Sequence, residues 1–165
     1  MAMYTRVLTP KHGPTLFVRP LRNGDTATVA AVFERLGEGS RRSRFHGPKP
    51  RLTTSDLEHL ARADGDHHAL VAYVNGEPIA IARLVRDGHS AEIAFEVADE
   101  FQGRGIGAAL TAELVADARA AGITEVTALV EMQNSAAVAL LRRVLKVLDI
   151  RFDGPELAIR AVLDP

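Results

Sequence analysis

The feature that most constrains the fold is a glycine-rich stretch, EFQGRGIGAAL, at residues 100–110. Gly103, Gly105 and Gly107 alternate in it, and apolar residues then recur at helical spacing as far as Gly122, a natural helix stop. Alternating glycines between a strand and a helix permit a tight turn and leave backbone N–H groups at the helix N-terminus free to hold an anion. The stretch therefore predicts a strand, loop and helix with an anion site in the loop.

Several interpretations of these glycines are open. The pattern from Gly103 to Ala108 fits a permissive form of the dinucleotide fingerprint, Gly-x-Gly-x-x-Ala. A Rossmann unit, however, would place it near the start of parallel βα repeats, whereas three hairpin-linked strand patterns precede it here. No Gly-Lys-Ser/Thr follows, which excludes a nucleotide P-loop. Two interpretations of the glycine stretch remain: a binding loop for another phosphate-bearing molecule, and a tight turn that binds no ligand.

The rest of the chain predicts one mixed α/β (α+β) domain over residues 1–165, with a largely antiparallel sheet flanked by helices. Strand patterns cover residues 15–21, 68–74, 78–85, 91–98, 126–131 and 157–163. Helix patterns cover residues 26–36, 55–64, 105–122 and 134–148, with Asp25 and Thr54 as N-caps of the first two. The Gly-, Pro- and Arg-rich residues 37–51 predict a loop or broken helix, a candidate lid.

Composition excludes several classes of site and partner. A net charge of −1 gives no general attraction to nucleic acid or to anionic membranes, and no apolar run reaches the 18 residues that span a bilayer. The absence of cysteine excludes disulfides, thiolate metal sites and a cysteine nucleophile. His67 and His68 point to opposite sides of a predicted strand and have no partner at metal-ligand spacing, so we expect no metal. A cytoplasmic location is the default expectation, and a homodimer is compatible with the sequence.

The segment FEVADEFQGRGIGAAL resembles the acetyl-CoA-binding segment of the GNAT superfamily of N-acetyltransferases, whose pattern Gln/Arg-x-x-Gly-x-Gly/Ala falls on Gln102, Gly105 and Gly107. The order of segments along most of the chain is also similar to that of the family. The resemblance implies the GNAT fold and acetyl-CoA as co-substrate, with backbone N–H groups around the pyrophosphate and the pantetheine arm beside the end of the preceding strand. The residues that it assigns to the cofactor are Val97, Gln102, Gly103, Arg104, Gly105, Ile106, Gly107, Ala108, Asn134 and Ala137.

Acetylating an amine requires a free lone pair, and deprotonating a lysine-like amine of pKa about 10.4 costs about 4.6 kcal/mol at pH 7. Glu92 and Glu96 share one face of the predicted strand, where they either serve as a base or simply face solvent. The stretch AEIAF is similar to protein lysine acetyltransferases of the superfamily, which implies that Glu92 is the general base. Glu96 is the reserve, because the spacing to the glycine loop allows a shift of one residue. The resemblance also implies that the Val97 N–H polarises the thioester carbonyl.

Two departures from the family pattern concern the last predicted helix. Leu141 stands where many members carry a tyrosine that protonates the leaving thiolate. A thiol of pKa about 8.5 is an undemanding leaving group, so acetyl transfer without that tyrosine is feasible. Leu145 and Lys146 replace the usual Gly-Phe, which predicts a longer helix.

The acceptor is predicted from a second resemblance. Residues 40–73 are similar to bacterial Pat-type protein lysine acetyltransferases, which implies a protein lysine as the acceptor amine. The matching residues are Ser40, Arg44, Phe45, Leu52, Asp64 and residues 69–72. A small-molecule amine acceptor and a non-catalytic acetyl-CoA-binding module are the alternatives. The basic run from Arg41 to Arg51 either faces the acceptor, contacts CoA phosphates or is a solvated loop.

Overall fold

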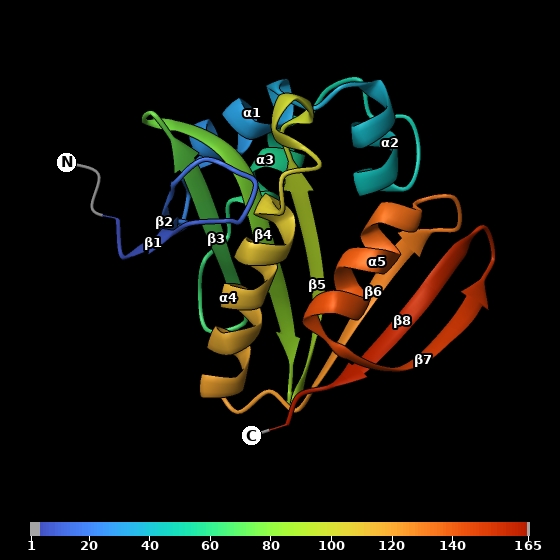
Figure 1. The fold of residues 1–165 in the computed structure, drawn as a ribbon. Helices are drawn as coiled ribbons and strands as arrows, with labels where there is room; N and C mark the ends of the chain where they lie inside the picture. The colour runs from blue at the N-terminus through green and yellow to red at the C-terminus, as the bar shows by residue number, and fades with distance from the viewer. Residues whose placement is uncertain (1–3, 165) are drawn as a thin grey trace.

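The computed structural model describes residues 4–164 and contains an eight-stranded sheet in the order β1-β2-β3-β4-β5-β6-β8-β7 (Figure 1). The strands are β1 (Arg6–Leu8), β2 (Leu16–Pro20), β3 (His67–Val74), β4 (Glu77–Asp87), β5 (Ser90–Val97), β6 (Glu125–Glu131), β7 (Lys146–Asp153) and β8 (Glu156–Val162). The helices are α1 (Thr26–Glu34), α2 (Glu38–Phe45), α3 (Thr54–Leu60), the 3-10 turn η1 (Asp99–Phe101), α4 (Ile106–Ala120) and α5 (Ser135–Val144). This architecture confirms the predicted mixed α/β fold with a mostly antiparallel sheet.

The sheet has two antiparallel parts that meet at a short parallel pairing. Strands β1 to β5 pair antiparallel in chain order, with β3, β4 and β5 as a hairpin-linked meander, and β6, β8 and β7 form the second part. Between them, β5 and β6 are paired only from Ser90↔Glu125 to Glu92↔Thr127. Beyond this point the two strands diverge, which gives the sheet a V-shaped opening (Figure 1).

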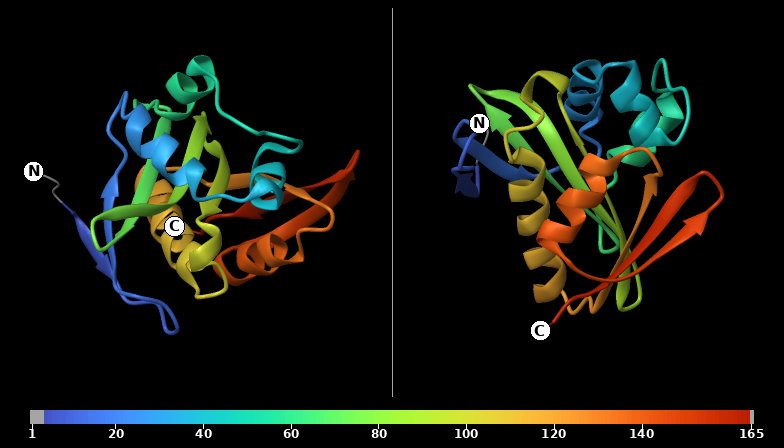
Figure 2. Two further views of the ribbon diagram at one scale, coloured as in Figure 1. Left: turned by 90° about the horizontal axis from the view of Figure 1, so that it is seen from above. Right: turned by 45° about the vertical axis from the view of Figure 1, so that its right-hand side comes forward.

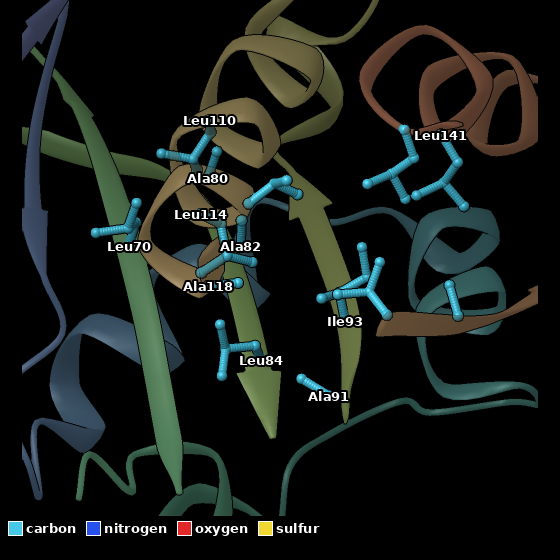
Figure 3. Packing of buried hydrophobic residues seen from close by; sticks show 14 of the residues in the cluster. Leu70, Ala80, Ala82, Leu84, Ala91, Ile93, Leu110, Leu114, Ala118 and Leu141 are labelled. Atoms are coloured by element: carbon cyan, nitrogen blue, oxygen red, sulfur yellow. The ribbon is translucent and has the colours of Figure 1, made fainter. Parts of the chain in front are cut away.

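Helices on both faces bury the apolar sides of the strands. On one face, α4 places Leu110 and Leu114 against Leu70 and Ala82, and α5 adds Leu141 to the same core (Figure 3). The side chains in this cluster are nearly or completely inaccessible to solvent. A smaller cluster on the opposite face joins α1 and α3 to β3 and β4 through Val29, Val32, Ala61, Val71 and Ile81. The larger core, which includes residues of β5, β6 and β8, therefore joins the two parts of the sheet on either side of the opening.

The C-terminal part of the chain corrects the predicted helix over residues 134–148. Helix α5 ends at Val144, Leu145 is extended, and Lys146–Asp153 is strand β7 instead. Pairing of β7 with β8 along Lys146↔Val162 to Asp153↔Glu156 supplies ladder hydrogen bonds that outweigh the helical propensity of Leu-Lys-Val-Leu. The longer helix inferred from Leu145 and Lys146 is therefore wrong.

Three smaller differences lie in the N-terminal half. Strand β1 was not predicted, because its three residues are too few to show a pattern. The N-cap of α3 is Thr53 rather than Thr54, since Thr53 forms a capping box with Asp56. Residues 38–45, predicted as loop or broken helix, form the continuous helix α2, which has no fully buried residue. The prediction that Asp25 caps α1 is confirmed by its hydrogen bond from the Thr28 N–H, 3.1 Å long.

Candidate active site

A cleft of about 570 Å³ lies in the opening between β5 and β6. Its walls come from the C-terminal half of β5, from β6, from the N-terminal turn of α4, from α5 and from α2. Seen from above, α2 lies between the meander and the C-terminal strands (Figure 2). A concave site where a sheet parts is a common location for ligand binding.

The end of β5 presents a free backbone N–H to this cleft. The Ala98 N–H donates to the Ile79 carbonyl of β4 at 2.8 Å. Because consecutive N–H groups of a strand point to opposite sides, the Val97 N–H points away from β4 and toward the opening, where β6 no longer pairs. The Val97 carbonyl on the same side accepts a hydrogen bond from Gln102 Nε2 at 2.9 Å. The cleft wall therefore carries an unpaired donor beside a carbonyl held by Gln102.

The glycine turn lies directly beyond this strand end. Gly103 and Gly105 have φ of 75° and 80°, a conformation that only glycine adopts readily. Gly105 is the N-cap of α4 and makes no side-chain capping hydrogen bond. The first N–H groups of α4 are therefore left to bind an anion, with the helix dipole adding partial positive charge.

A third glycine permits a close approach between two helices. A Cβ on Gly107 would lie 2.9 Å from Leu140 Cδ1 of α5 and 3.4 Å from Val97 Cγ2. Asn134 is the N-cap of helix α5, and its Oδ1 accepts a hydrogen bond from the Ala137 N–H at 3.1 Å. The capped start of α5 thus packs beside the glycine turn, and Asn134 and Ala137 both line the cleft.

The two candidate acids occupy different places. As predicted, Glu92 and Glu96 are on the face of β5 opposite the Ile93 side chain, which packs in the α4 core. Glu96 lines the cleft, and its side chain is only 6% exposed. Glu92 is exposed and lies where β5 and β6 are still paired, in a second hollow with Thr127 and Arg160. The structure does not bring Glu92 to the cleft, because the strands part only beyond it.

Glu96 is held between two arginines. Its Oε2 accepts a hydrogen bond from Arg44 Nε of α2 at 2.6 Å, and its Oε1 is 3.5 Å from Arg83 Nη2 of β4. Burial lowers the pKa of the Arg83 guanidinium, and the charge of Glu96 opposes that shift. The carboxylate and α2 are therefore coupled through a buried ion pair.

Most of the residues predicted to bind the cofactor line the cleft, and Arg104 lies outside it. Gln102, Gly103, Gly105, Ile106, Gly107 and Ala108 line the cleft with Val97, Asn134 and Ala137. Arg104 does not line it: the Arg104 guanidinium lies 5.4 Å from the Phe101 ring centroid. The Leu141 side chain is fully buried in the core and is also absent from the cleft lining.

Helix α2 supplies residues whose role the sequence left open. Three of the five basic side chains between Arg41 and Arg51 have partners within the protein. Arg41 stacks on Phe33 at 4.1 Å, Lys49 pairs with Asp56 at 3.0 Å, and Arg44 pairs with Glu96. The Ser40 hydroxyl donates to Asp99 Oδ1 at 2.6 Å, which ties α2 to η1. The run is therefore a folded wall of the cleft with several internal contacts.

His46 is a cleft residue that sequence reasoning missed. It follows the last turn of α2, and its Nδ1 lies 2.5 Å from Glu156 Oε2 at the start of β8. The two residues are far apart in the chain, so no local pattern could have joined them.

Within residues 4–164 no cluster of three or more His, Cys, Asp or Glu side chains could hold a metal ion. No helix in that range is long and apolar enough to cross a membrane.

Comparison with known proteins identifies the family. The model of the acetyltransferase (GNAT) family matches residues 33–146. This chain belongs to the GNAT family. Its sequence is 36% identical over 138 residues to Acetyltransferase Pat of Mycolicibacterium smegmatis, covering 79% of this chain and 41% of that relative. The chain therefore spans less than half the length of this curated GNAT relative.

Solved structures share the GNAT fold. The GNAT domain of S. lividans PAT superposes with a TM-score of 0.87 and 28% identity, covering 96% of both chains. The PaiA N-acetyltransferase from Thermoplasma acidophilum, solved with coenzyme A, superposes with a TM-score of 0.66 over 90% of this chain and 99% of that chain. At 20% identity this second likeness concerns the fold alone.

Family membership confirms the predicted enzyme class and acetyl-CoA as the co-substrate. The residues present fit that molecule. An uncapped helix start at a glycine turn suits the pyrophosphate, and the unpaired Val97 N–H along a diverging strand suits an extended polar arm. The cleft thus has the features that a GNAT domain needs to hold acetyl-CoA.

Proposed function

We propose that this protein transfers the acetyl group of acetyl-CoA directly to a primary amine, with a lysine side chain of a protein as the acceptor. The observation that carries this proposal is the convergence of three features on one cleft: the glycine turn, the unpaired N–H of Val97 and the buried carboxylate of Glu96. A site of this composition can hold an anionic cofactor on one side and a cationic acceptor on the other.

On the cofactor side, acetyl-CoA supplies an activated acetyl group as a thioester. The N–H groups of Gly103 to Ala108 hold the pyrophosphate, and Asn134 and Ala137 border the arm that runs along β5. The Val97 N–H donates to the carbonyl oxygen as negative charge develops there, a contribution of about 3 kcal/mol for a single preorganised donor. These residues orient the thioester, and no covalent intermediate with the enzyme is needed.

On the acceptor side, we propose Glu96 rather than Glu92 as the carboxylate that attracts the acceptor ammonium. Glu96 lines the cleft, whereas Glu92 lies in the second hollow, below the point where the strands part. Helix α2 covers this side through the bond from Arg44 to Glu96. An acceptor must therefore enter past α2.

The lysine acceptor is supported by the likeness to Pat-type enzymes in the segment that forms this wall. Ser40 and Arg44, which match that group in sequence, both line the cleft. Because β5 and β6 are unpaired beyond Glu92, the cleft lies between the two strands, where an acceptor side chain can be placed beside the thioester.

The test uses labelled acetyl-CoA with lysine-containing proteins and peptides, and with polyamines and free amino acids as small acceptors. We expect label on lysine side chains as a hydroxylamine-resistant amide. Glu96→Gln should reduce turnover by at least tenfold, whereas the matched Glu92→Gln should retain most of it. Transfer only to small amines would contradict the lysine acceptor. Acetyl-CoA binding without transfer to any amine would contradict catalysis.

A further inference from the structure

The two carboxylate oxygens of Glu96 have different surroundings. Oε2 accepts the hydrogen bond from Arg44 Nε at 2.6 Å. Oε1 makes no hydrogen bond with any residue between 4 and 164, and it lies 3.5 Å from Arg83 Nη2. Unlike Nε and Nη2 of Arg83, this oxygen is not enclosed by protein. One oxygen of Glu96 is therefore fixed by α2, and the other is left for a ligand in the cleft.

Arg44 is itself held in place. Its guanidinium lies 4.9 Å from the Phe45 ring centroid, and the Phe45 ring packs against Phe33 of α1 at 5.8 Å between centroids. The Ser40 hydroxyl anchors the first turn of α2 to Asp99 by a hydrogen bond of 2.6 Å. Helix α2 has no fully buried residue, so its position depends on contacts of this kind. They make the Arg44 N–H a preorganised donor to the carboxylate.

Arg83 adds a second positive charge from the sheet. Its side chain is buried, its Nη1 donates to the Leu60 carbonyl, and its Nη2 faces Glu96 Oε1. Burial lowers the pKa of the Arg83 guanidinium, and the charge of Glu96 opposes that shift. Among residues 4–164, Arg44 of α2 and Arg83 of β4 are the charged side chains within 4 Å of the Glu96 oxygens. A buried carboxylate stays ionised when cations lie beside it in this way.

The two arginines differ in what they can do for this carboxylate. Arg83, at 3.5 Å and without a hydrogen bond to Glu96, contributes charge but does not fix the orientation of the group. Arg44 does both, because a charge-assisted hydrogen bond of 2.6 Å restricts rotation of the carboxylate. Without Arg44, the carboxylate of Glu96 is free to turn toward Arg83 and away from the cleft.

We propose that Arg44 is a positioning residue for acetyl transfer: it holds Oε2 of Glu96 so that Oε1 is presented to the acceptor amine. The inference rests on the proposed function and deepens it. The acceptor ammonium gives one proton to Oε1, directly or through a water molecule, and the amine nitrogen attacks the thioester carbon. The C–N bond forms, the C–S bond breaks, and the second nitrogen proton goes to the leaving thiolate. Glu96 then returns its proton to solvent.

Two other roles for Arg44 predict different results. If the pair with Glu96 only stabilised the fold, loss of Arg44 would lower the Tm and leave the turnover of the folded protein unchanged. If the guanidinium competed with the acceptor ammonium for the carboxylate, loss of Arg44 would raise turnover. A positioning role predicts slower turnover together with a change in the pH dependence of the reaction.

The test compares Arg44→Met, which removes the charge and the Nε–H, with Arg44→Lys, which keeps the charge. Arg42→Met is the matched control, because Arg42 is an exposed residue of the same helix and does not line the cleft. Turnover of a lysine peptide is measured at a temperature where circular dichroism shows each variant folded. We expect kcat of Arg44→Met to fall by about 10- to 100-fold with the KM for acetyl-CoA unchanged. Arg44→Lys should recover part of kcat, and the control should match the wild type.

The pH dependence separates positioning from packing. In Arg44→Met the acidic limb of the kcat/KM profile for the peptide should move to higher pH by about one unit, because the buried carboxylate has lost its nearest cation. In Arg44→Lys this limb should stay near that of the wild type. The same shift should appear without turnover, as a higher titration midpoint of the Glu96 carboxyl carbon in NMR, with the resonance assigned by its loss in Glu96→Gln.

Wild-type turnover with an unmoved acidic limb in Arg44→Met would overturn the inference, and so would faster turnover. An unmoved NMR midpoint in this variant would overturn it independently of activity. If the wild-type protein acetylates no amine, the proposed function fails, and the NMR titration then shows separately whether Arg44 controls the Glu96 carboxylate.

Discussion

Arg44→Ala is expected to destabilise the protein by about 3 kcal/mol, because it removes the close partner of a buried carboxylate. The Glu96 side chain is 6% exposed, and Arg44 Nε lies 2.6 Å from its Oε2. Arg83 remains at 3.5 Å, so the loss should lie at the lower end of the 3–5 kcal/mol typical of broken buried pairs. For a domain of this size, about 3 kcal/mol corresponds to a decrease in Tm of roughly 6–12 °C.

The assay is thermal and urea unfolding followed by circular dichroism, with Arg42→Ala as the matched control. Arg42 is on the same helix, is exposed, and has no ion pair within residues 4–164. Its replacement should change stability by less than about 0.5 kcal/mol. Adding Glu96→Gln to Arg44→Ala should not recover the loss, since it leaves the buried Arg83 guanidinium without its carboxylate partner. Equal stability of the Arg44→Ala and Arg42→Ala proteins would refute the argument that this pair is buried and structurally important.

Two further predictions concern the glycine turn and α3. Gly105→Ala should lower the free energy of unfolding by about 1–2 kcal/mol, because φ is 80° at this residue, and should weaken acetyl-CoA binding measured by calorimetry. The control Gly65→Ala, at a position without positive φ and with open space around it, should change neither the stability nor the binding. Hydrogen bonds from the Thr53 backbone N–H and from Lys49 lower the pKa of Asp56 from 3.8 to about 2. Ionised Asp56 therefore stabilises the folded state above pH 3.8, and this contribution is lost as the pH falls through about 2. The Tm difference between wild type and Asp56→Asn should be largest near neutral pH and vanish near pH 2, and a difference independent of pH would contradict this account.

The glycine turn and the helix that follows it could be predicted from the sequence, because their signals are local. Gly103 and Gly105 require positive φ, and the helix that follows has a regular apolar pattern, so turn and helix could be recognised together. Strands β3, β4 and β5 were equally recognisable, because an Asn-Gly turn and alternating residues mark an antiparallel meander.

The acceptor side could not be predicted, because it depends on contacts between distant segments. Glu92 and Glu96 share a face of β5, and only the point at which β6 leaves β5 decides that Glu96 alone lines the cleft. No periodicity in the sequence reports where two strands part. The proximity of His46 to Glu156 likewise arises from the packing of α2 against the C-terminal strands.

The central claim is that acetyl-CoA occupies the opening between β5 and β6 with its pyrophosphate at the glycine turn. Amide hydrogen exchange with and without acetyl-CoA tests it most directly, because exchange slows where an N–H is covered or hydrogen-bonded. We expect slower exchange at Val97 and at residues 103–108, and no change in β7. Saturating acetyl-CoA that leaves these amides unprotected, or that protects only the second hollow around Thr127 and Arg160, would contradict the account.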